Sequence, residues 1–237
     1  MTSGTLREVQ EGALPTTSLR LVFNFNNITS FPFASLSSFS PGLLSLDLRS
    51  NALGEFPALA SSTLQTLYLS NNPLGSLPVS AFVSTPSLVD LHLSNTQIPE
   101  VFTGTFTPLT QLVNLGLGNN LLRRLEEGAI QAATSLALID LGYNTLTYVH
   151  PQAFPGFTNG WLYIHHNGLT KLEENVWRTV MQGPEAYLDP YGNPLQCGCD
   201  VAWLVSDPTL MAKVDIYTTC ADGRPLISLD PEEFQAC

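Results

Sequence analysis

The chain has few cations and no long apolar run. Its 237 residues include 9 Lys and Arg against 20 Asp and Glu, so the formal net charge is −11 and only 12% of residues are charged. A surface so poor in cations cannot neutralise phosphates, which argues against nucleic acid and anionic membranes as partners. No apolar stretch approaches the ~18 residues of a transmembrane helix. The 44% hydrophobic content nevertheless predicts a folded chain.

A pattern of about 24 residues recurs between residues 19 and 195. Eight segments follow L-x-x-L-x-L-x-x-N-x-L, with the Asn position repeating at intervals of 21 to 26 residues. This Asn column comprises Asn26, Asn51, Asn72, Thr96, Asn120, Asn144, Asn167 and Asn193. Apolar residues also recur five and ten positions later, as at Leu77 and Phe82. A fixed period of this length indicates stacked structural repeats.

Each repeat predicts one short strand followed by a turn. The two leucines of L-x-L alternate with outward residues, so a strand would bury one face, and stacked strands would pair in parallel and share a core. The turn leaves backbone groups inside the stack, and an Asn side chain can satisfy them because it both donates and accepts. Thr96 has less capacity for hydrogen bonds, so we expect a locally looser turn there.

These segments resemble the leucine-rich repeat family. Residues 77 to 82, Leu-Pro-Val-Ser-Ala-Phe, are similar to the animal extracellular subclass. The resemblance implies an α/β horseshoe solenoid with a parallel sheet on the concave face and short irregular or 3-10 segments on the convex face. We expect repeats over residues 1–195, starting in the middle of a repeat, and a small helical, cysteine-rich cap over 196–237.

All four cysteines, Cys197, Cys199, Cys220 and Cys237, lie in the expected cap. Four cysteines allow three pairings, and a Cys197–Cys199 bridge would close a strained small ring. A zinc site is the alternative, but its ligands usually come as C-x₂₋₄-C pairs. The extracellular family pattern implies Cys197–Cys220 and Cys199–Cys237.

Three short helices are expected within the cap. Asp200 is predicted to be an N-cap, Asp207 an N-cap followed by Pro208 at N1, and Asp230 an N-cap with Glu233 at N3 as in a capping box. Trp203, ten residues after Asn193, is expected to continue the core of the repeats into the cap.

The N-terminal residues match the second half of a repeat. Residues 9–14, VQEGAL, align with residues 125–130, LEEGAI, and no cysteine cap or signal peptide precedes them. We therefore expect that a signal peptide and at least one repeat are missing from this chain. Two disulfides require an oxidising compartment, so the protein is expected to be extracellular and secreted. The sequon at Asn27 predicts a glycosylation site, with an ordinary turn Asn as the alternative.

The outward strand positions change in character along the chain. The middle of the expected concave face is small and polar, whereas its C-terminal third gathers aromatic and acidic residues. The candidate partner-binding residues are Tyr143, Trp161, Tyr163, His165, His166, Tyr187, Asp140 and Asp189, with Tyr191 nearby. Aromatic side chains with polar ends are typical of protein-binding hot spots, so a protein partner is expected here. The alternatives are that strands simply favour aromatic residues, or that missing segments cover them.

Catalytic and cofactor motifs are not found in the sequence. The G-x-G at Gly116 and Gly118 lacks a third glycine, and no G-x-S-x-G or H-E-x-x-H is present. Adjacent strand residues such as His165 and His166 point to opposite sides except near the end of a strand, and the nearby carboxylates are a strand away, which makes a metal site there unfavourable. We expect a protein that is not an enzyme and has no cofactor or metal.

The cap also resembles a narrower family. The strings CGCDVAWLV, CADG and LDPEEFQAC lie in the cap of about 45 residues, and this cap is similar to crustacean proteins named as the non-catalytic subunit of Oplophorus-luciferin 2-monooxygenase. That resemblance implies an accessory subunit of a secreted luciferase, with a small catalytic subunit as partner. An arthropod recognition or adhesion protein, a receptor ectodomain and an innate immune pattern binder are the alternatives.

Overall fold

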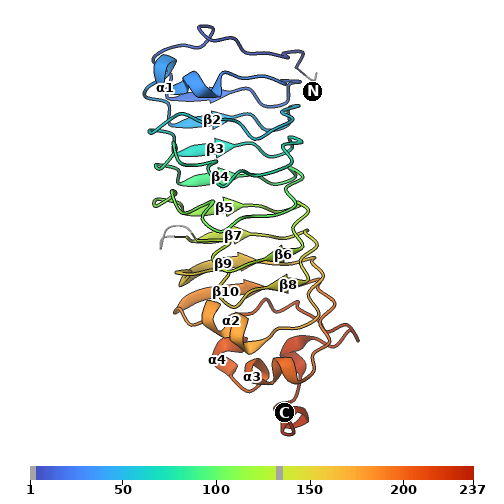
Figure 1. Ribbon diagram of the computed structural model, residues 1–237. Coiled ribbons are helices and arrows are strands. Elements are labelled where there is room, and N and C mark those ends of the chain that lie inside the picture. The colour runs from blue at the N-terminus through green and yellow to red at the C-terminus, as the bar shows by residue number, and fades with distance from the viewer. Residues whose placement is uncertain (1–3, 132–135) are drawn as a thin grey trace.

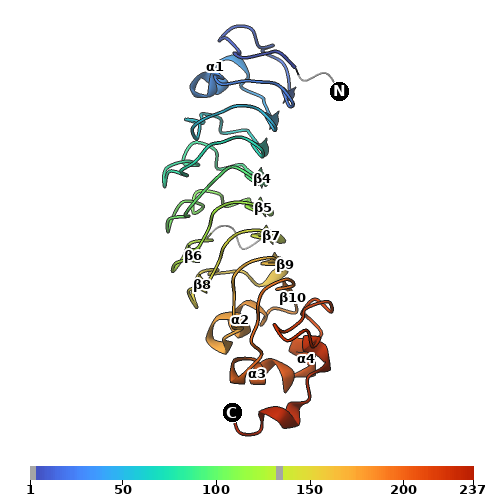
Figure 2. The same cartoon turned by 90° about the vertical axis from the view of Figure 1, so that its right-hand side faces the viewer.

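The computed structural model describes residues 4–131 and 136–237, which form an elongated stack of repeats (Figure 1). Within these residues, an eight-stranded parallel sheet has the order β1-β2-β3-β4-β5-β7-β9-β10. Its strands are Arg20–Val22, Ser45–Asp47, Thr66–Tyr68, Asp90–His92, Asn114–Gly116, Leu138–Asp140, Asn159–Tyr163 and Glu185–Asp189. The sheet occupies the inner side of the gently curved stack, and the connecting segments occupy the outer side (Figure 2).

The outer side has less regular structure. Strands β6 (Arg124–Leu125) and β8 (Tyr148–Val149) pair in parallel there, away from the main sheet (Figures 1 and 2). A single turn, α1 (Leu36–Phe39), lies near the N-terminus, and α2 (Glu174–Val180) covers the last repeat. The sequence predicted only irregular or 3-10 segments on this side. The seven-residue helix α2 differs from that expectation because Val176, Trp177 and Val180 form one buried face.

The strands stack in register, and this places the same repeat position on neighbouring strands side by side. The next-to-last residue of each strand points inward and is buried: Leu21, Leu46, Leu67, Leu91, Leu115, Ile139, Leu162 and Leu188. Burying one such side chain contributes roughly 1.5–3 kcal/mol. One continuous core therefore runs through the repeats, and the residues directly before and after each of these positions face outward.

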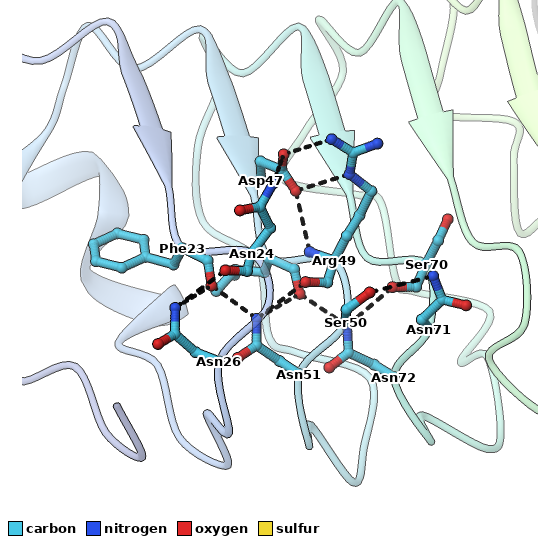
Figure 3. A network of polar contacts seen from close by, with 11 residues as sticks. Phe23, Asn24, Asn26, Asp47, Arg49, Ser50, Asn51, Ser70, Asn71 and Asn72 are labelled. Carbon is cyan, nitrogen blue, oxygen red and sulfur yellow. Dashed lines mark hydrogen bonds and ion pairs between the residues drawn. The ribbon is translucent and has the colours of Figure 1, made fainter. Parts of the chain in front are cut away.

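The Asn column joins each repeat to the one before it. Asn51 Nδ2 donates to the carbonyl oxygens of Phe23 and Leu48, each at 2.9 Å, and its Oδ1 accepts from Ile28 N at 2.9 Å. Figure 3 shows Asn26, Asn51 and Asn72 in a row beneath successive strands. Buried carbonyl and amide groups would otherwise lose their hydrogen bonds, which explains the Asn at this position.

Thr96 breaks the column, but it does not open the turn. Its Oγ1 donates to Leu93 O at 2.7 Å, and Asn120 Oδ1 accepts from Thr96 N at 3.0 Å. The expectation of a looser turn is wrong, because the hydroxyl closes the turn and the next Asn holds it. What differs is the bond to the preceding repeat. In other repeats the Asn side chain accepts from a backbone N–H of the preceding repeat, but Leu74 N, which would be the donor to residue 96, donates to Asn72 O instead.

The residue just before the Asn column has a left-handed backbone in every repeat. The positions are Phe25, Ser50, Asn71, Asn95, Asn119, Tyr143, His166 and Gly192, with φ between 50° and 72°. This conformation points each backbone N–H toward the following repeat, where for example Asn71 N donates to Ser94 O at 3.0 Å. Gly and Asn tolerate such angles, whereas other residues adopt them at a cost of roughly 1–2 kcal/mol.

The cap closes the C-terminal end with two disulfides. Cys197 is bonded to Cys220 and Cys199 to Cys237, which is the pairing that the extracellular family pattern implies. The helical segments are α3 (Ala202–Val205), α4 (Pro208–Met211) and three 3-10 turns, Cys199–Val201, Leu226–Ser228 and Pro231–Phe234. No helix in the described part of the chain is long and apolar enough to cross a membrane.

Of the first two predicted N-caps in this region, one forms and the other does not. Asp207 accepts from Thr209 N and Leu210 N, with Pro208 in the first turn, as the sequence predicted. Asp200 is not an N-cap: its Oδ2 accepts from Leu172 N at 2.9 Å, so it holds the cap against the last repeat.

The third cap is half formed. Asp230 accepts from Glu232 N, but the carboxylate of Glu233 pairs with Arg224 at 2.9 Å instead of returning to the Asp230 backbone. The expected capping box is therefore incomplete, because an ion pair is available to Glu233. Trp203 is buried and donates from Nε1 to Leu172 O at 2.8 Å, which continues the core into the cap.

Candidate functional site: an aromatic patch on the sheet

The candidate residues from β7, β9, β10 and the turns after them lie on one outward surface. We call this surface the aromatic patch: Asp140, Tyr143, Trp161, Tyr163, His165, His166, Tyr187, Asp189 and Tyr191. The parallel register places Tyr187 beside Trp161, and Tyr163 between Asp140 and Asp189. All eight residues that the sequence singled out are therefore on neighbouring strands or on the turns that follow them.

The rings of the patch form a connected series. Trp161 stacks on Tyr187 with centroids 4.9 Å apart and planes 19° apart, and it lies 5.6 Å from Tyr163. Tyr143 stacks on His166 at 4.5 Å. Edge contacts then join His165 to Tyr163 and Tyr143, and His166 to Tyr191. Each stacked pair contributes about 0.5–1.5 kcal/mol beyond area burial, so the rings are held in place before any partner arrives.

Two glycines make room for the two histidines. A methyl group on Gly142 would collide with the ring of His165, and one on Gly192 would lie 2.6 Å from His166 Nδ1. The absence of a side chain at each glycine therefore lets the histidine approach the neighbouring repeat closely. The sequence analysis did not find this role, although the two glycines stand beside the histidines in the repeat alignment.

Tyr143 and His166 occupy left-handed positions, which four of the other six repeats fill with Asn or Gly and the first two with Phe25 and Ser50. Because Tyr143 and His166 adopt this conformation at a cost, backbone stability alone does not account for them. Both histidines reach the same surface because His166, with φ 50°, belongs to the turn and not to the strand. The expected alternation of neighbouring strand residues does not apply there.

The patch is exposed although its rings are stacked. Tyr143 is 57% exposed and Trp161 is 38% exposed. Exposed aromatic surface of this kind is what protein interfaces favour at their centres. A cavity of about 720 Å³ lies elsewhere, on the outer side around Gln152, Phe154 and Phe157, and no residue of the patch lines it. The patch itself is an exposed surface.

The two carboxylates give the patch a negative field. Burial raises the pKa of Asp189 above its ordinary value; the hydrogen bond from Tyr191 N and the nearby His165 oppose this rise, and Asp215 adds to it. His165 Nδ1 lies 3.2 Å from Asp189 Oδ2. Burial also raises the pKa of the Tyr163 hydroxyl, and the charges of Asp189 and Asp140 raise it further. No group of three His, Cys, Asp or Glu side chains suited to a metal occurs among the described residues.

The first repeats of the same sheet have a polar cluster instead. Asp47 accepts from Arg49 Nε at 3.0 Å and Nη2 at 2.8 Å, and from Asn24 Nδ2 at 3.1 Å (Figure 3). The Arg49 guanidinium lies over the Tyr68 ring, 4.7 Å from its centroid. Burial would raise the pKa of Asp47, but the Arg49 and Asn24 bonds outweigh it and hold that pKa below its ordinary value.

The predicted glycosylation site is accessible. The Asn27 side chain is exposed, and Thr29 Oγ1, two residues later, donates to Arg7 O at 3.3 Å. Glycosylation at Asn27 stays a prediction.

Comparisons with known proteins agree with this architecture. The leucine rich repeat model matches residues 62–122 and 110–169. The chain is 35% identical over 236 residues to the Oplophorus-luciferin 2-monooxygenase non-catalytic subunit of Oplophorus gracilirostris. The similarity covers 98% of this chain, well beyond the cap in which the sequence first suggested it, and 65% of that relative, so the chain spans less than two thirds of the relative's length.

Solved structures show the same fold. A chain of the Drosophila Toll–Spatzle complex superimposes with a TM-score of 0.75 at 22% identity, over 97% of this chain and 34% of that one. A chain of the octameric latrophilin 3, Unc5D and FLRT2 complex gives 0.74 at 20%, over 92% and 76%. A chain of the TLR13–ssRNA13 complex gives 0.68 at 26%, over 81% and 27%. The in-register strands, the Asn column and these matches together show that the chain has the leucine-rich repeat fold.

Proposed function

We propose that this chain is a non-catalytic, extracellular protein-binding module that contacts its partner through the aromatic patch. The observation that carries the proposal is the connected series of seven rings, two of them on left-handed backbone positions. Repeat proteins use such extended surfaces to bind other proteins, and Trp and Tyr dominate the energy of protein interfaces.

The partner is proposed to be the catalytic subunit of a secreted luciferase-type complex. This follows from the 35% identity to a protein named as the non-catalytic subunit of Oplophorus-luciferin 2-monooxygenase. A non-catalytic role also agrees with the open shape of the patch, since catalytic sites usually exclude water in concave pockets. The two disulfides support an oxidising, extracellular location.

Affinity capture tests this proposal. The chain would be immobilised and exposed to native secretion or haemolymph, and the retained proteins identified by mass spectrometry. Three baits are needed: the native chain, Trp161→Ala/Tyr163→Ala, and the matched control Tyr68→Ala/His92→Ala. The control removes another pair of stacked rings, 4.7 Å apart, from the N-terminal half of the same sheet.

We expect the native and control baits to retain a small luciferase-like protein, and the Trp161→Ala/Tyr163→Ala bait to lose at least about tenfold of it. Two hot-spot residues commonly contribute more than 1 kcal/mol each, which corresponds to such a change. Equal capture by all three baits would place the interface outside the aromatic patch. Retention of other surface proteins instead would favour a recognition or adhesion role.

A further inference from the structure

The N-terminal polar cluster and the aromatic patch use the same repeat positions. Asp47 and Asp140 both occupy the last residue of a strand, and each has a tyrosine in register on the next strand, Tyr68 and Tyr163. Both carboxylates also accept a backbone bond from the residue two positions later, Arg49 N at 3.1 Å and Gly142 N at 2.9 Å. The backbone therefore presents the two carboxylates in the same way.

The side-chain donors present at Asp47 are missing at Asp140. Arg49, two residues after Asp47, corresponds to Gly142, and Asn24 on the preceding repeat corresponds to Gly118. A methyl group on Gly118 would lie 2.9 Å from Asp140 Oδ2, so the carboxylate leans over an open position. Among the described residues no side chain donates to Asp140.

Asp189 repeats the arrangement on the other side of Tyr163. It is in register with Tyr163 and accepts from Tyr191 N at 3.0 Å, and its near neighbour is the His165 ring. Tyr163 thus has a carboxylate on each side, whereas Tyr68 has Asp47 together with the arginine that neutralises it.

Among the described residues, no arginine or lysine forms an ion pair with Asp140 or Asp189. Arg20 and Arg49 lie on or just after strands of the main sheet, but in its first two repeats. Lys213 lies in the cap segment that borders β10, and its Nζ donates to Met181 O at 2.9 Å and Gly183 O at 2.6 Å. The two carboxylates of the patch therefore have phenol and imidazole groups beside them, but no ammonium or guanidinium group paired with them. A complementary ligand is a cation with several N–H donors.

We infer that the aromatic patch binds an arginine side chain of the protein partner, with the guanidinium against Tyr163 and hydrogen-bonded to Asp140 and Asp189, as Arg49 lies against Tyr68 and Asp47. This rests on the proposed function and adds the chemistry of the partner to it. Arginine fits better than lysine because its planar fork can bond a carboxylate through two N–H groups and lie on a ring.

The probe is N-acetyl-L-arginine amide, titrated into the isotopically labelled chain near neutral pH and followed by the amide signals in two-dimensional NMR. The lysine and citrulline amides are run in parallel, since citrulline has nearly the same shape without the charge. The variants are Asp140→Asn, Asp189→Asn and the matched control Asp90→Asn. Asp90 is on the same face, but its carboxylate already accepts from Asn114 Nδ2 at 2.6 Å.

We expect saturable shifts at residues 140–143, 161–166 and 187–191 with the arginine amide, unchanged in Asp90→Asn and weakened about tenfold or more in Asp140→Asn and Asp189→Asn. An equal response to citrulline or lysine amide, or shifts that ignore the two substitutions, overturns the inference. Unchanged spectra elsewhere in each variant establish that the fold is intact. The probe needs no partner, so the two proposals can fail separately. If the arginine amide does not bind but the luciferase-like protein is captured, only the arginine inference is wrong. If the amide binds but that protein is not captured, only the proposed identity of the partner is wrong.

Discussion

The carboxylates on the first and last repeats of the main sheet differ in whether an arginine of the chain pairs with them. In the N-terminal repeats Asp47 is 1% exposed and neutralised by an arginine of its own chain. In the C-terminal repeats Asp140 and Asp189 lie beside partly exposed rings, and neither forms an ion pair with an arginine or lysine of the described residues. The backbone geometry is the same, so the difference comes only from outward side chains. The carboxylate of the N-terminal region is paired within the chain, whereas those of the C-terminal region are proposed to pair with a cation of the partner.

The largest difference should appear when Arg49 is removed. Arg49→Ala leaves the buried Asp47 carboxylate without its two guanidinium bonds, and we expect the free energy of unfolding to fall by about 2–3 kcal/mol. Urea unfolding followed by circular dichroism measures this. Arg224→Ala is the matched control, because Arg224 pairs with Asp222 and Glu233 on the exposed cap surface, and we expect little change there. Equal losses in both variants would contradict the contrast between the two regions.

The second prediction transfers the N-terminal arrangement to the patch. Gly142→Arg/His165→Ser reproduces the positions of Arg49 and Ser70 around Asp140 and Tyr163. The new guanidinium should occupy the proposed arginine site, so binding of the arginine amide should fall at least about tenfold. Unfolding free energy should rise by about 1 kcal/mol or less, since the pair is partly exposed. Undiminished amide binding with an unchanged fold would show that the ligand lies elsewhere.

The third prediction concerns pH, where the two carboxylates should act with opposite sign. The folded pKa of Asp47 is lowered, so its ionisation contributes stability that is present above the unfolded value of about 3.9 and lost as pH falls through the folded pKa. The folded pKa of Asp189 is raised, so its ionisation costs stability as pH rises from about 3.9 through the folded pKa.

Urea unfolding between acid and neutral pH separates the two effects. Asp47→Asn should be destabilised relative to the native chain mainly at neutral pH. Asp189→Asn should gain relative to the native chain over the same rise in pH. Each pH-dependent difference should be about 1 kcal/mol or less after solvent screening. The same sign for both variants would refute the assignment.

The smallest effect should come from the left-handed column. Tyr143→Asn relieves a strain of roughly 1 kcal/mol but loses the stack on His166, so we expect a net gain of about 0.5 kcal/mol together with weaker partner capture. Asn119→Tyr, at the same position one repeat earlier, should have the opposite sign in stability. A loss of stability in Tyr143→Asn would mean that the ring stack outweighs the backbone strain.

The repeat pattern predicted the sheet because its signal is periodic and local. Each L-x-L segment became a strand, and the turn after each strand was held by the Asn column. The expectations that were wrong, at Thr96 and Asp200 and in part at Glu233, concern residues whose partners lie outside their own segment. The contacts are made with Asn120, Leu172 and Arg224 respectively. These partners lie in other segments of the chain, so a local sequence pattern does not predict the contacts.

The composition of the candidate site could be predicted, but not its geometry. In-register stacking follows from the period, so the sequence could bring the aromatic residues to one face. Two features of the site depend on backbone angles that the sequence pattern does not give. One is the space that Gly142 and Gly192 leave for the histidine rings, and the other is the left-handed turn that brings His166 to the same surface as His165. The absence of an arginine beside Asp140 became apparent only from the structure, in which Arg49 pairs with Asp47 at the equivalent repeat position.

The cap borders the patch directly. The backbone of Leu188, the buried next-to-last residue of β10, donates to Lys213 O at 2.9 Å and accepts from Asp215 N at 3.0 Å, so the cap provides the last hydrogen-bonded edge of the sheet. Tyr187 and Asp189 are the neighbours of Leu188 along that strand. Reduction of the Cys197–Cys220 bridge should therefore loosen β10 and weaken partner binding, which makes the affinity of this surface depend on the redox state of its surroundings.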